Sequence, residues 1–225
     1  MGWGIDQLEA STQADKKASV SVAQAIASHI RYLARGKPFT VQHFTKFGSR
    51  SAVDKALARL VRASALERVA RGVYMRPKSS PYVGKVRPGP VTVMMAMAKA
   101  RGEIIQVHGA EAVRWFRLST QVQVRPMYYT SGSSRDLRVG DAVVHLRHVS
   151  ADKLQCAGSQ AGLALCALFY IGRRELTGAM VQTILSRLDT GEAERLMRCR
   201  MPRWMRKIVD GACGQSTPAS ARGKG

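Results

Sequence analysis

The sequence has few acidic residues, few aromatic residues and few cysteines, and these shortages restrict what the protein can be. Asp and Glu number 15 among 225 residues, against 36 Lys and Arg, so the formal net charge is +21. Such an excess of positive charge favours a polyanionic partner, of which nucleic acid is the simplest. The chain is 45% hydrophobic and 23% charged, which is typical of a globular protein and excludes a disordered one.

The cysteines do not form a metal or redox motif. There are four of them, and they contain no C-x-x-C pair and no histidine partner at a zinc-ligand spacing: Cys156, Cys166, Cys199 and Cys213. We therefore predict ordinary reduced cysteines, several of them in the core. The sequence predicts no metal and no cofactor.

Long hydrophobic runs are also missing. The longest, Ala161–Ile171, contains Gly162 and is far shorter than the roughly 20 residues that a membrane-spanning helix needs. The N-terminal sequence MGWGIDQLEAS has neither the cationic start nor the apolar segment of a secretory signal. These features predict a soluble, cytoplasmic protein without a membrane partner.

The most informative stretch is Pro38–Pro77, which predicts two helices followed by a β-hairpin. The expected elements are a short helix over Val41–Thr45 capped by Thr40, a turn at Lys46–Gly48, a helix from the Ser49 cap to about Ala63, and strands over Leu66–Val69 and Val73–Met75. A supporting helix is expected from Ser19 or Ser21 to Ala34, ended by Gly36. This is the order of a winged helix-turn-helix, whose second helix enters the major groove of DNA.

The second helix of this stretch is amphipathic. Val53, Leu57, Leu60 and Val61 fall on one face, and the opposite face is polar and basic. An ordinary amphipathic helix with a solvated basic face gives the same pattern. We favour double-stranded DNA as the partner because the helix follows a helix-turn unit, precedes a hairpin and belongs to a strongly basic chain.

We assign the candidate DNA-binding residues by their position. Near the N-terminus of the second helix, where side chains reach base edges, are Ser49, Arg50, Ser51, Asp54 and Lys55. Arg50 is the expected base-reading residue because arginine can grip guanine with two hydrogen bonds. Phosphate contacts are expected from Arg59 and Arg62 further along that helix and from Gln42, His43 and Lys46 on the helix before it. Arg68 and Arg71 on the wing are expected to touch phosphate or enter the minor groove.

The composition divides the chain into five parts and predicts an α+β fold. These are a disordered arm (1–18), a winged helix-turn-helix domain (19–77), an extended Pro-, Gly- and Ser-rich linker (78–89), a second domain (90–214) and a disordered tail (215–225). In the second domain a small mixed or antiparallel sheet precedes a helical part. Its expected helices are Val91–Arg101, Ala110–Leu118, Ser159–Ile171, Thr177–Ser186, Glu192–Cys199 and Pro202–Ala212, and its expected strands are Glu103–Val107, Val122–Thr130, Asp136–Val139 and Ala142–Val149.

We find no catalytic constellation in the sequence and predict that the protein is not an enzyme. Glu103 with Gln106, and Asp136 with Asp141, are the pairs that suggest a nuclease-like metal site. Glu103 has no second carboxylate at a fixed short spacing and no lysine placed after it, and Asp136 and Asp141 sit at strand ends, where acidic residues commonly serve turns. The histidines have no triad partners, and the loop Ser131–Ser134 lacks the pattern of a phosphate-binding loop. The role of the basic C-terminal helices is left open between a solvated face and a surface for an acidic partner or for more nucleic acid.

The sequence resembles the AbiEi-type antitoxins of type IV toxin–antitoxin and abortive-infection systems. The run Ser49–Pro77 matches the family's basic helix and its Leu-x-Arg-x-x-Arg-Gly-x-Tyr wing, and IIQVHGAEAVRWFRLSTQV and MYYTSGSSRDLRVGDAVVHLRHV resemble its middle region. The matching wing residues are Leu66, Arg68, Arg71, Gly72 and Tyr74. The similarity covers about Ser21–Val149, and it departs from the family pattern at Ala63–Ala65, where a glycine usually follows the helix.

The resemblance implies a bacterial antitoxin that represses its own operon by binding the operator through the winged domain. The second domain would neutralise a nucleotidyltransferase-type toxin, and the resemblance leaves open whether the two proteins form a direct complex. We expect a monomer in free solution and leave cooperative binding on DNA open. Two alternatives remain: a winged-helix transcriptional regulator whose second domain senses a ligand or partner, and a nucleic-acid enzyme.

Overall fold

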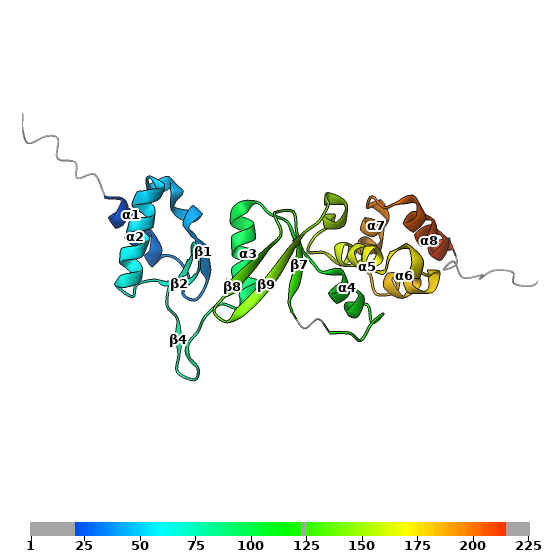
Figure 1. Cartoon of the computed structure of the whole chain (residues 1–225), viewed down its shortest axis with the longest axis horizontal. Coiled ribbons are helices and arrows are strands. Elements are labelled where there is room, and N and C mark those ends of the chain that lie inside the picture. Colours follow the sequence, from blue (N-terminus) through cyan, green and yellow to red (C-terminus); the bar gives the residue numbers. More distant parts are fainter. Residues whose placement is uncertain (1–20, 123–124, 215–225) are drawn as a thin grey trace, which may run out of the picture. The chain divides into compact units, whose positions relative to one another are not determined.

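The computed structural model describes residues 21–122 and 125–214, and they form two compact units with an α+β fold (Figure 1). The boundaries of these units are Met1–Pro88 and Gly89–Gly225. The predicted fold class is therefore confirmed. The arm and the tail that the sequence predicts lie outside the described residues. Within those residues, no helix is both long enough and apolar enough to cross a membrane.

The first unit combines two α-helices, a 3₁₀-helix and a small antiparallel sheet. In chain order its elements are α1 (Val22–Arg31), β1 (Pro38–Thr40), η1 (Val41–Phe47), α2 (Arg50–Arg62), β2 (Glu67–Ala70), β3 (Val73–Met75), β4 (Ser79–Ser80) and β5 (Gly84–Lys85). The strand order of the main sheet is β1-β3-β2, with β3 antiparallel to both neighbours. The helix–turn–helix–hairpin order expected from the sequence is present, with β1 as an additional strand.

The expected end of α1 at Ala34 is wrong. The helix starts at the expected place, because Ser21 and Gln24 form a capping box, but it ends at Arg31. The Nη1 atom of Arg76 donates hydrogen bonds to the backbone oxygens of Arg31 and Leu33, at 2.6 and 2.8 Å. A side chain 45 residues away thus satisfies carbonyls at the helix terminus, which local sequence cannot reveal.

Two further expectations for the first unit need correction. Val41–Phe47 is a 3₁₀-helix and not an α-helix, and the Thr40 side chain makes no capping hydrogen bond. The segment 77–90 is not a plain extended linker, because β4 and β5 form a two-stranded hairpin. Tyr82 and Val83 lie at its tip and are 95% and 72% exposed, so they do not pack the segment against the domain.

Helices α1, η1 and α2 enclose the core of the first unit. Phe44, Ile26 and Leu57 are completely buried, and Val53 is nearly so. Aromatic rings surround Phe44: those of Phe39, His29 and His43 meet it edge-on at centroid distances of 5.2–5.8 Å. Because Val53 and Leu57 belong to α2, this core determines which face of α2 is buried and which is left for solvent.

Along the chain of the second unit, the strands of a four-stranded sheet precede a group of C-terminal helices. Its elements are α3 (Pro90–Arg101), β6 (Ile105–Val107), α4 (Gly109–Trp115), β7 (Met127–Thr130), β8 (Arg135–Val139), β9 (Ala142–His148), η2 (Ala151–Leu154), α5 (Gln160–Glu175), α6 (Gly178–Leu185), α7 (Thr190–Arg198) and α8 (Arg203–Gly214). The strand order is β6-β7-β9-β8. The sheet is mixed, because β7 and β9 run parallel while the other pairs are antiparallel.

The last four residues of the expected strand over Val122–Thr130 form β7, whereas residues 123–124 of that prediction lie outside the described residues. β7 starts after Pro126, whose missing N–H group disfavours a place inside the ladder. Of the two expected versions of the sheet, the mixed one is correct and the purely antiparallel one is wrong, because β7 and β9 run parallel. In contrast, the four expected C-terminal helices are all present within a few residues of their predicted bounds.

Helix α5 is the centre of the second unit. Helix α5 packs against α4 and against α7 and α8, and α6 packs against α8 (Figure 1). The run Ala164–Leu168 of α5 is buried throughout. Two glycines allow close approach here. A Cβ atom on Gly162 would lie 2.1 Å from the backbone oxygen of Cys156, and one on Gly109 would lie 2.3 Å from the Tyr170 Cβ.

Candidate nucleic-acid interface

The candidate interface is built on α2, whose two faces differ sharply. Ser49 caps the helix by accepting a hydrogen bond from the Ala52 N–H group. Val53, Ala56 and Leu57 are buried on the core side. The opposite side is exposed along the whole helix and carries Arg50, Ser51, Asp54, Lys55, Arg59 and Arg62. The helix therefore presents four cations and one carboxylate to solvent from a rigid, well-anchored support.

Arg50 and Asp54 form an ion pair one turn apart on this face. The Arg50 Nε lies 2.9 Å from an Asp54 carboxylate oxygen, and both side chains are about half exposed or more. Exposed pairs of this kind contribute little to stability, so the guanidinium is free to exchange Asp54 for another acceptor. Asp54 thus competes with any nucleic acid for Arg50, and the sequence analysis did not identify this competition.

The predicted backbone-contacting residues of η1 are exposed, as are those of the β2–β3 hairpin. Gln42, His43 and Lys46 project from η1, and Lys46 lies over the Phe47 ring with its Nζ 5.2 Å from the centroid. Arg68 lies on β2, and Arg71 lies in the tight turn, where Gly72 has a φ of +75°. That left-handed conformation favours glycine. All the residues that sequence analysis assigned to DNA therefore lie on the surface of one unit.

His43 has a second role that the sequence did not indicate. Its Nε2 atom lies 2.9 Å from the Nε2 of His29 on α1, so the two imidazoles share one hydrogen bond. If both rings were protonated, neither nitrogen could accept, and two like charges would face each other. Burial, His29 and Lys46, in that order, lower the pKa of His43 from its usual 6.5.

This histidine pair should make the stability of the first unit depend on pH. The pKa of His43 is lower in the folded protein than in the unfolded chain, so acid favours unfolding. The contribution is fully present above about pH 6.5 and is lost as the pH falls from 6.5 through the lowered pKa. Urea unfolding followed by circular dichroism at pH 7.5 and 5.5 should show a smaller loss for His43→Gln than for the wild type. Equal losses in the two proteins would contradict this assignment.

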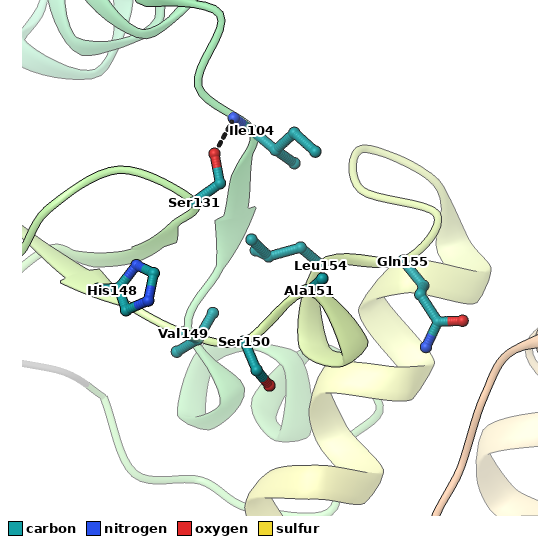
Figure 2. Close-up of a pocket in the computed structure, with 8 residues that line it drawn as sticks. All are labelled: Ile104, Ser131, His148, Val149, Ser150, Ala151, Leu154 and Gln155. Atoms are coloured by element: carbon teal, nitrogen blue, oxygen red, sulfur yellow. Dashed lines mark hydrogen bonds between the residues drawn. The ribbon is translucent and has the colours of Figure 1, made fainter.

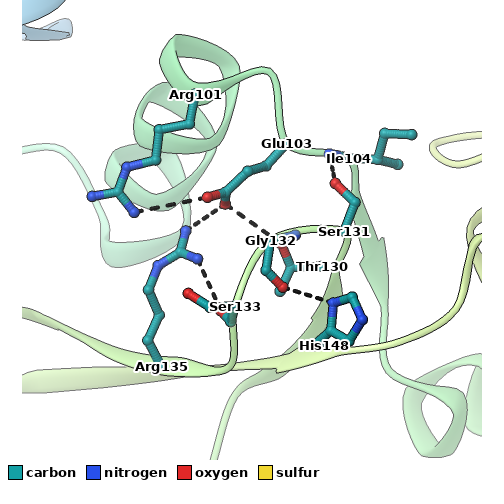
Figure 3. A network of polar contacts seen from close by, with 9 residues as sticks. All are labelled: Arg101, Glu103, Ile104, Thr130, Ser131, Gly132, Ser133, Arg135 and His148. Atoms are coloured by element: carbon teal, nitrogen blue, oxygen red, sulfur yellow. Dashed lines mark hydrogen bonds and ion pairs between the residues drawn. The ribbon is translucent and has the colours of Figure 1, made fainter.

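Glu103, which the sequence suggested as a metal ligand, instead contacts basic and polar side chains of the second unit. Glu103 accepts hydrogen bonds from Arg135 and from Thr130, and Arg101 lies within 3.8 Å of its other oxygen (Figure 3). The Glu103 side chain is 12% exposed, and a Cβ atom on Gly132 would lie 2.5 Å from its carboxyl carbon. Glu103 thus ties the end of α3 to the loop before β8.

Asp136 and Gln106, two other residues considered as metal ligands, lie in different surroundings. Asp136 contacts the Nδ1 atom of His145 at 2.7 Å on the neighbouring strand, and Gln106 is buried with an amide nitrogen that has no hydrogen-bond partner. Across residues 21–122 and 125–214, no three His, Cys, Asp or Glu side chains cluster in a way that could hold a metal ion.

The second unit also contains a pocket, which the sequence did not reveal. It has a volume of about 440 Å³ and lies between the start of β6, the end of β9 and η2 (Figure 2). The walls are mainly aliphatic, from Ile104, Val149, Ala151 and Leu154, and His148 lies at one side. Because the Nδ1 of His148 is 2.9 Å from the Gly132 carbonyl oxygen, which can only accept, Nδ1 carries the proton and Nε2 is an acceptor in the neutral ring.

The fold class is α+β, and comparison with known proteins adds a family. The chain belongs to a family of unknown function, DUF6088, whose model matches residues 25–218. Among solved structures it is similar to the crystal structure of the RV2827C protein from Mycobacterium tuberculosis, with 14% sequence identity and a TM-score of 0.40 over 85% of this chain and 76% of that one. No curated protein sequence matches the chain.

Proposed function

We propose that the first unit is a winged helix-turn-helix that binds double-stranded DNA through the exposed face of α2. The observation that carries this proposal is the division of α2 into a buried apolar face and an exposed face with Arg50, Lys55, Arg59 and Arg62. In such a unit η1 and the β2–β3 turn contact the backbone on either side. The net charge of +21 supplies long-range attraction to the polyanion.

The position of each cation on α2 suggests its contact. Arg50 is the first residue of the helix, where the free N–H groups and the helix dipole favour a nearby phosphate and side chains reach into the groove. Arg59 and Arg62 belong to the last turn and lie further from the groove floor, so phosphates are their natural partners. The interface therefore combines one sequence-reading arginine with several sequence-independent cations.

Binding to the DNA upstream of the protein's own gene tests this proposal. We expect tighter binding to that duplex than to a shuffled duplex of equal length and composition, as measured by fluorescence anisotropy. If about six phosphates are contacted, the logarithm of the affinity should fall with the logarithm of salt concentration with a slope of about −5. Equal affinity for both duplexes, or no salt dependence, would overturn the proposal.

Asp54 should lower the affinity of this interface for DNA. Replacing it by asparagine keeps the size of the side chain but removes a negative charge and releases Arg50 from its ion pair. We expect Asp54→Asn to bind both duplexes about two- to tenfold more tightly at low salt, with a smaller gain at high salt because exposed charges are screened.

A matched control for this prediction is available in the second unit. Asp152 on η2 is also exposed, so Asp152→Asn removes the same charge from the second unit and not from the α2 face, and it should leave DNA affinity nearly unchanged. If both variants gain equally, net charge explains the effect. A gain for the shuffled duplex with a loss for the upstream duplex would instead mean that Asp54 itself contacts a base.

We further propose that the protein is an autorepressing antitoxin for a nucleotidyltransferase-type toxin. The support for this role is the sequence resemblance to AbiEi-type antitoxins, and the second unit is the part assigned to neutralisation. Co-expression with the adjacent gene tests the role through growth. The neighbour alone should arrest growth, the full chain should restore it, and a chain starting at Gly89 should also restore it if the second unit is sufficient.

The second candidate is a transcriptional regulator whose second unit senses a ligand. The pocket between β6, β9 and η2 favours it, because aliphatic walls beside a hydrogen-bond acceptor suit a small apolar molecule with one donor group. A harmless neighbouring gene in the co-expression experiment would favour this candidate over the antitoxin role. Both candidates require DNA binding by the first unit.

A further inference from the structure

Two thiols that are far apart in the sequence lie side by side in the second unit. The Sγ atoms of Cys156 and Cys199 are 3.7 Å apart, although 43 residues separate them. Cys156 lies in the exposed segment before α5, whereas Cys199 is buried at the end of α7. A disulfide needs an S–S distance of about 2.05 Å, so a movement of less than 2 Å would bring the two atoms to bonding distance.

The backbone of Cys156 is held in a conformation that cysteine seldom adopts. Its φ is +53°, in the left-handed region that favours glycine. Its carbonyl oxygen accepts hydrogen bonds from the N–H and the hydroxyl of Ser159, at 3.1 and 2.9 Å, and packs against Gly162. Such local strain persists only where the surroundings impose it, and it often marks a functional position.

Hydrogen bonds join the chain segment next to Cys156 to the segment next to Cys199. The side chain of Gln155 donates to the Arg200 carbonyl at 3.0 Å and accepts from the Arg200 N–H at 2.8 Å. Arg206 donates to the carbonyl of Cys199 at 2.6 Å. The residue before Cys156 is thus bonded in both directions to the residue after Cys199, which keeps the sulfurs adjacent.

We propose that Cys156 and Cys199 form a reversible disulfide when the protein meets a low-molecular-weight disulfide such as oxidised glutathione. The thiolate of Cys156 attacks one sulfur of the oxidant, which forms a mixed disulfide and releases one thiolate. Cys199 then loses its proton to solvent and attacks the Cys156 sulfur, and the second thiolate leaves. The two cysteines are oxidised and the oxidant is reduced to two thiols.

The order of these steps follows from exposure. Cys156 is accessible to a solvent-borne oxidant, and Cys199 is not. Burial, and then the contact with Cys156, raise the pKa of Cys199 to about 12, so its thiolate is scarce at neutral pH and ring closure is the slower step. Cys166 is fully enclosed, and burial also raises its pKa to about 12, which makes it a poor competitor.

Mass spectrometry of the full chain treated with oxidised glutathione tests the proposal. We expect the intact protein to lose two hydrogen atoms and to keep no glutathione. Trypsin cleaves after lysine and arginine, so the linked product should join the peptide 154–173 to the dipeptide Cys199–Arg200. Cys166 lies on the same peptide, and the experiment is therefore repeated with Cys166→Ala, which should give the same link.

Variants separate the proposed pair from the remaining thiols. Cys156→Ser should abolish the link, whereas Cys213→Ser should form it as the wild type does. The link closes a long loop, so oxidation should raise the Tm of the wild type by about 5–10 °C, and a reducing agent should reverse the rise. Glutathione that stays attached to Cys156, a link that survives Cys156→Ser, or a chain that stays fully reduced would each overturn the proposal.

Discussion

Replacing Phe44 by alanine should destabilise the first unit by about 3–5 kcal/mol, the largest effect that we expect from a single substitution. Phe44 has no exposed surface, and the rings of Phe39, His29, His43 and Phe47 lie against it. The substitution would leave a cavity between α1, η1 and α2, because the surrounding backbone cannot collapse to fill it. A domain of this size has a free energy of unfolding of only about 5–15 kcal/mol, so the loss is a large part of its stability.

Hydrogen–deuterium exchange of the full chain measures this effect locally. Amides of α1 and α2 should lose protection in Phe44→Ala, and amides of α5 in the second unit provide an internal reference. Tyr32→Ala is a matched control, since Tyr32 is an aromatic residue of the same unit that is 88% exposed. A loss of protection in α2 that is equally large for Tyr32→Ala would show that Phe44 is not the centre of this core.

Replacing Arg50 by alanine should relax the sequence preference of DNA binding. If Arg50 grips a guanine with two hydrogen bonds, its loss should cost about 1–3 kcal/mol on the upstream duplex, which is roughly 5- to 150-fold in affinity. The shuffled duplex should lose much less. The fold should tolerate the change, because Arg50 begins α2 with an exposed side chain and its ion pair with Asp54 is solvated.

Arg59→Ala provides the contrast on the same helix face. Arg59 lies in the last turn of α2, so its loss should weaken binding to both duplexes by a similar factor and reduce the salt slope by about 1. Competition titrations with both duplexes at two salt concentrations distinguish the two patterns. If Arg50→Ala and Arg59→Ala both bound the upstream duplex as the wild type does, α2 would not be the recognition helix.

Local sequence patterns were sufficient to predict the elements on which the candidate interface rests. The Ser49 cap and the spacing of Val53 and Leu57 predicted both the start of α2 and its buried face, and the structure has both. The signal is strong because a cap and a helical period act within a few residues of each other. The same holds for α3, whose bounds Pro90–Arg101 agree with the expected helix over Val91–Arg101.

The pairing of β-strands that lie far apart in the sequence was not predictable from such local patterns. The sequence indicated neither β1 nor the parallel pairing of β7 with β9, because a strand of three or four residues has almost no period of its own and takes its place from its neighbour. The early end of α1 has the same origin, since the carbonyl of its last residue, Arg31, accepts a hydrogen bond from the distant Arg76.

Composition and local patterns thus established the strong positive charge, the α+β class, and a basic helix that follows a helix-turn unit and precedes a hairpin. The folded arrangement was needed to show that His43 shares a hydrogen bond with His29 and that Cys156 lies against Cys199. The difference follows from how far apart in the chain the interacting residues lie. Charge, capping and periodicity are properties of neighbouring residues, whereas these contacts depend on how packed elements bring distant parts of the chain together.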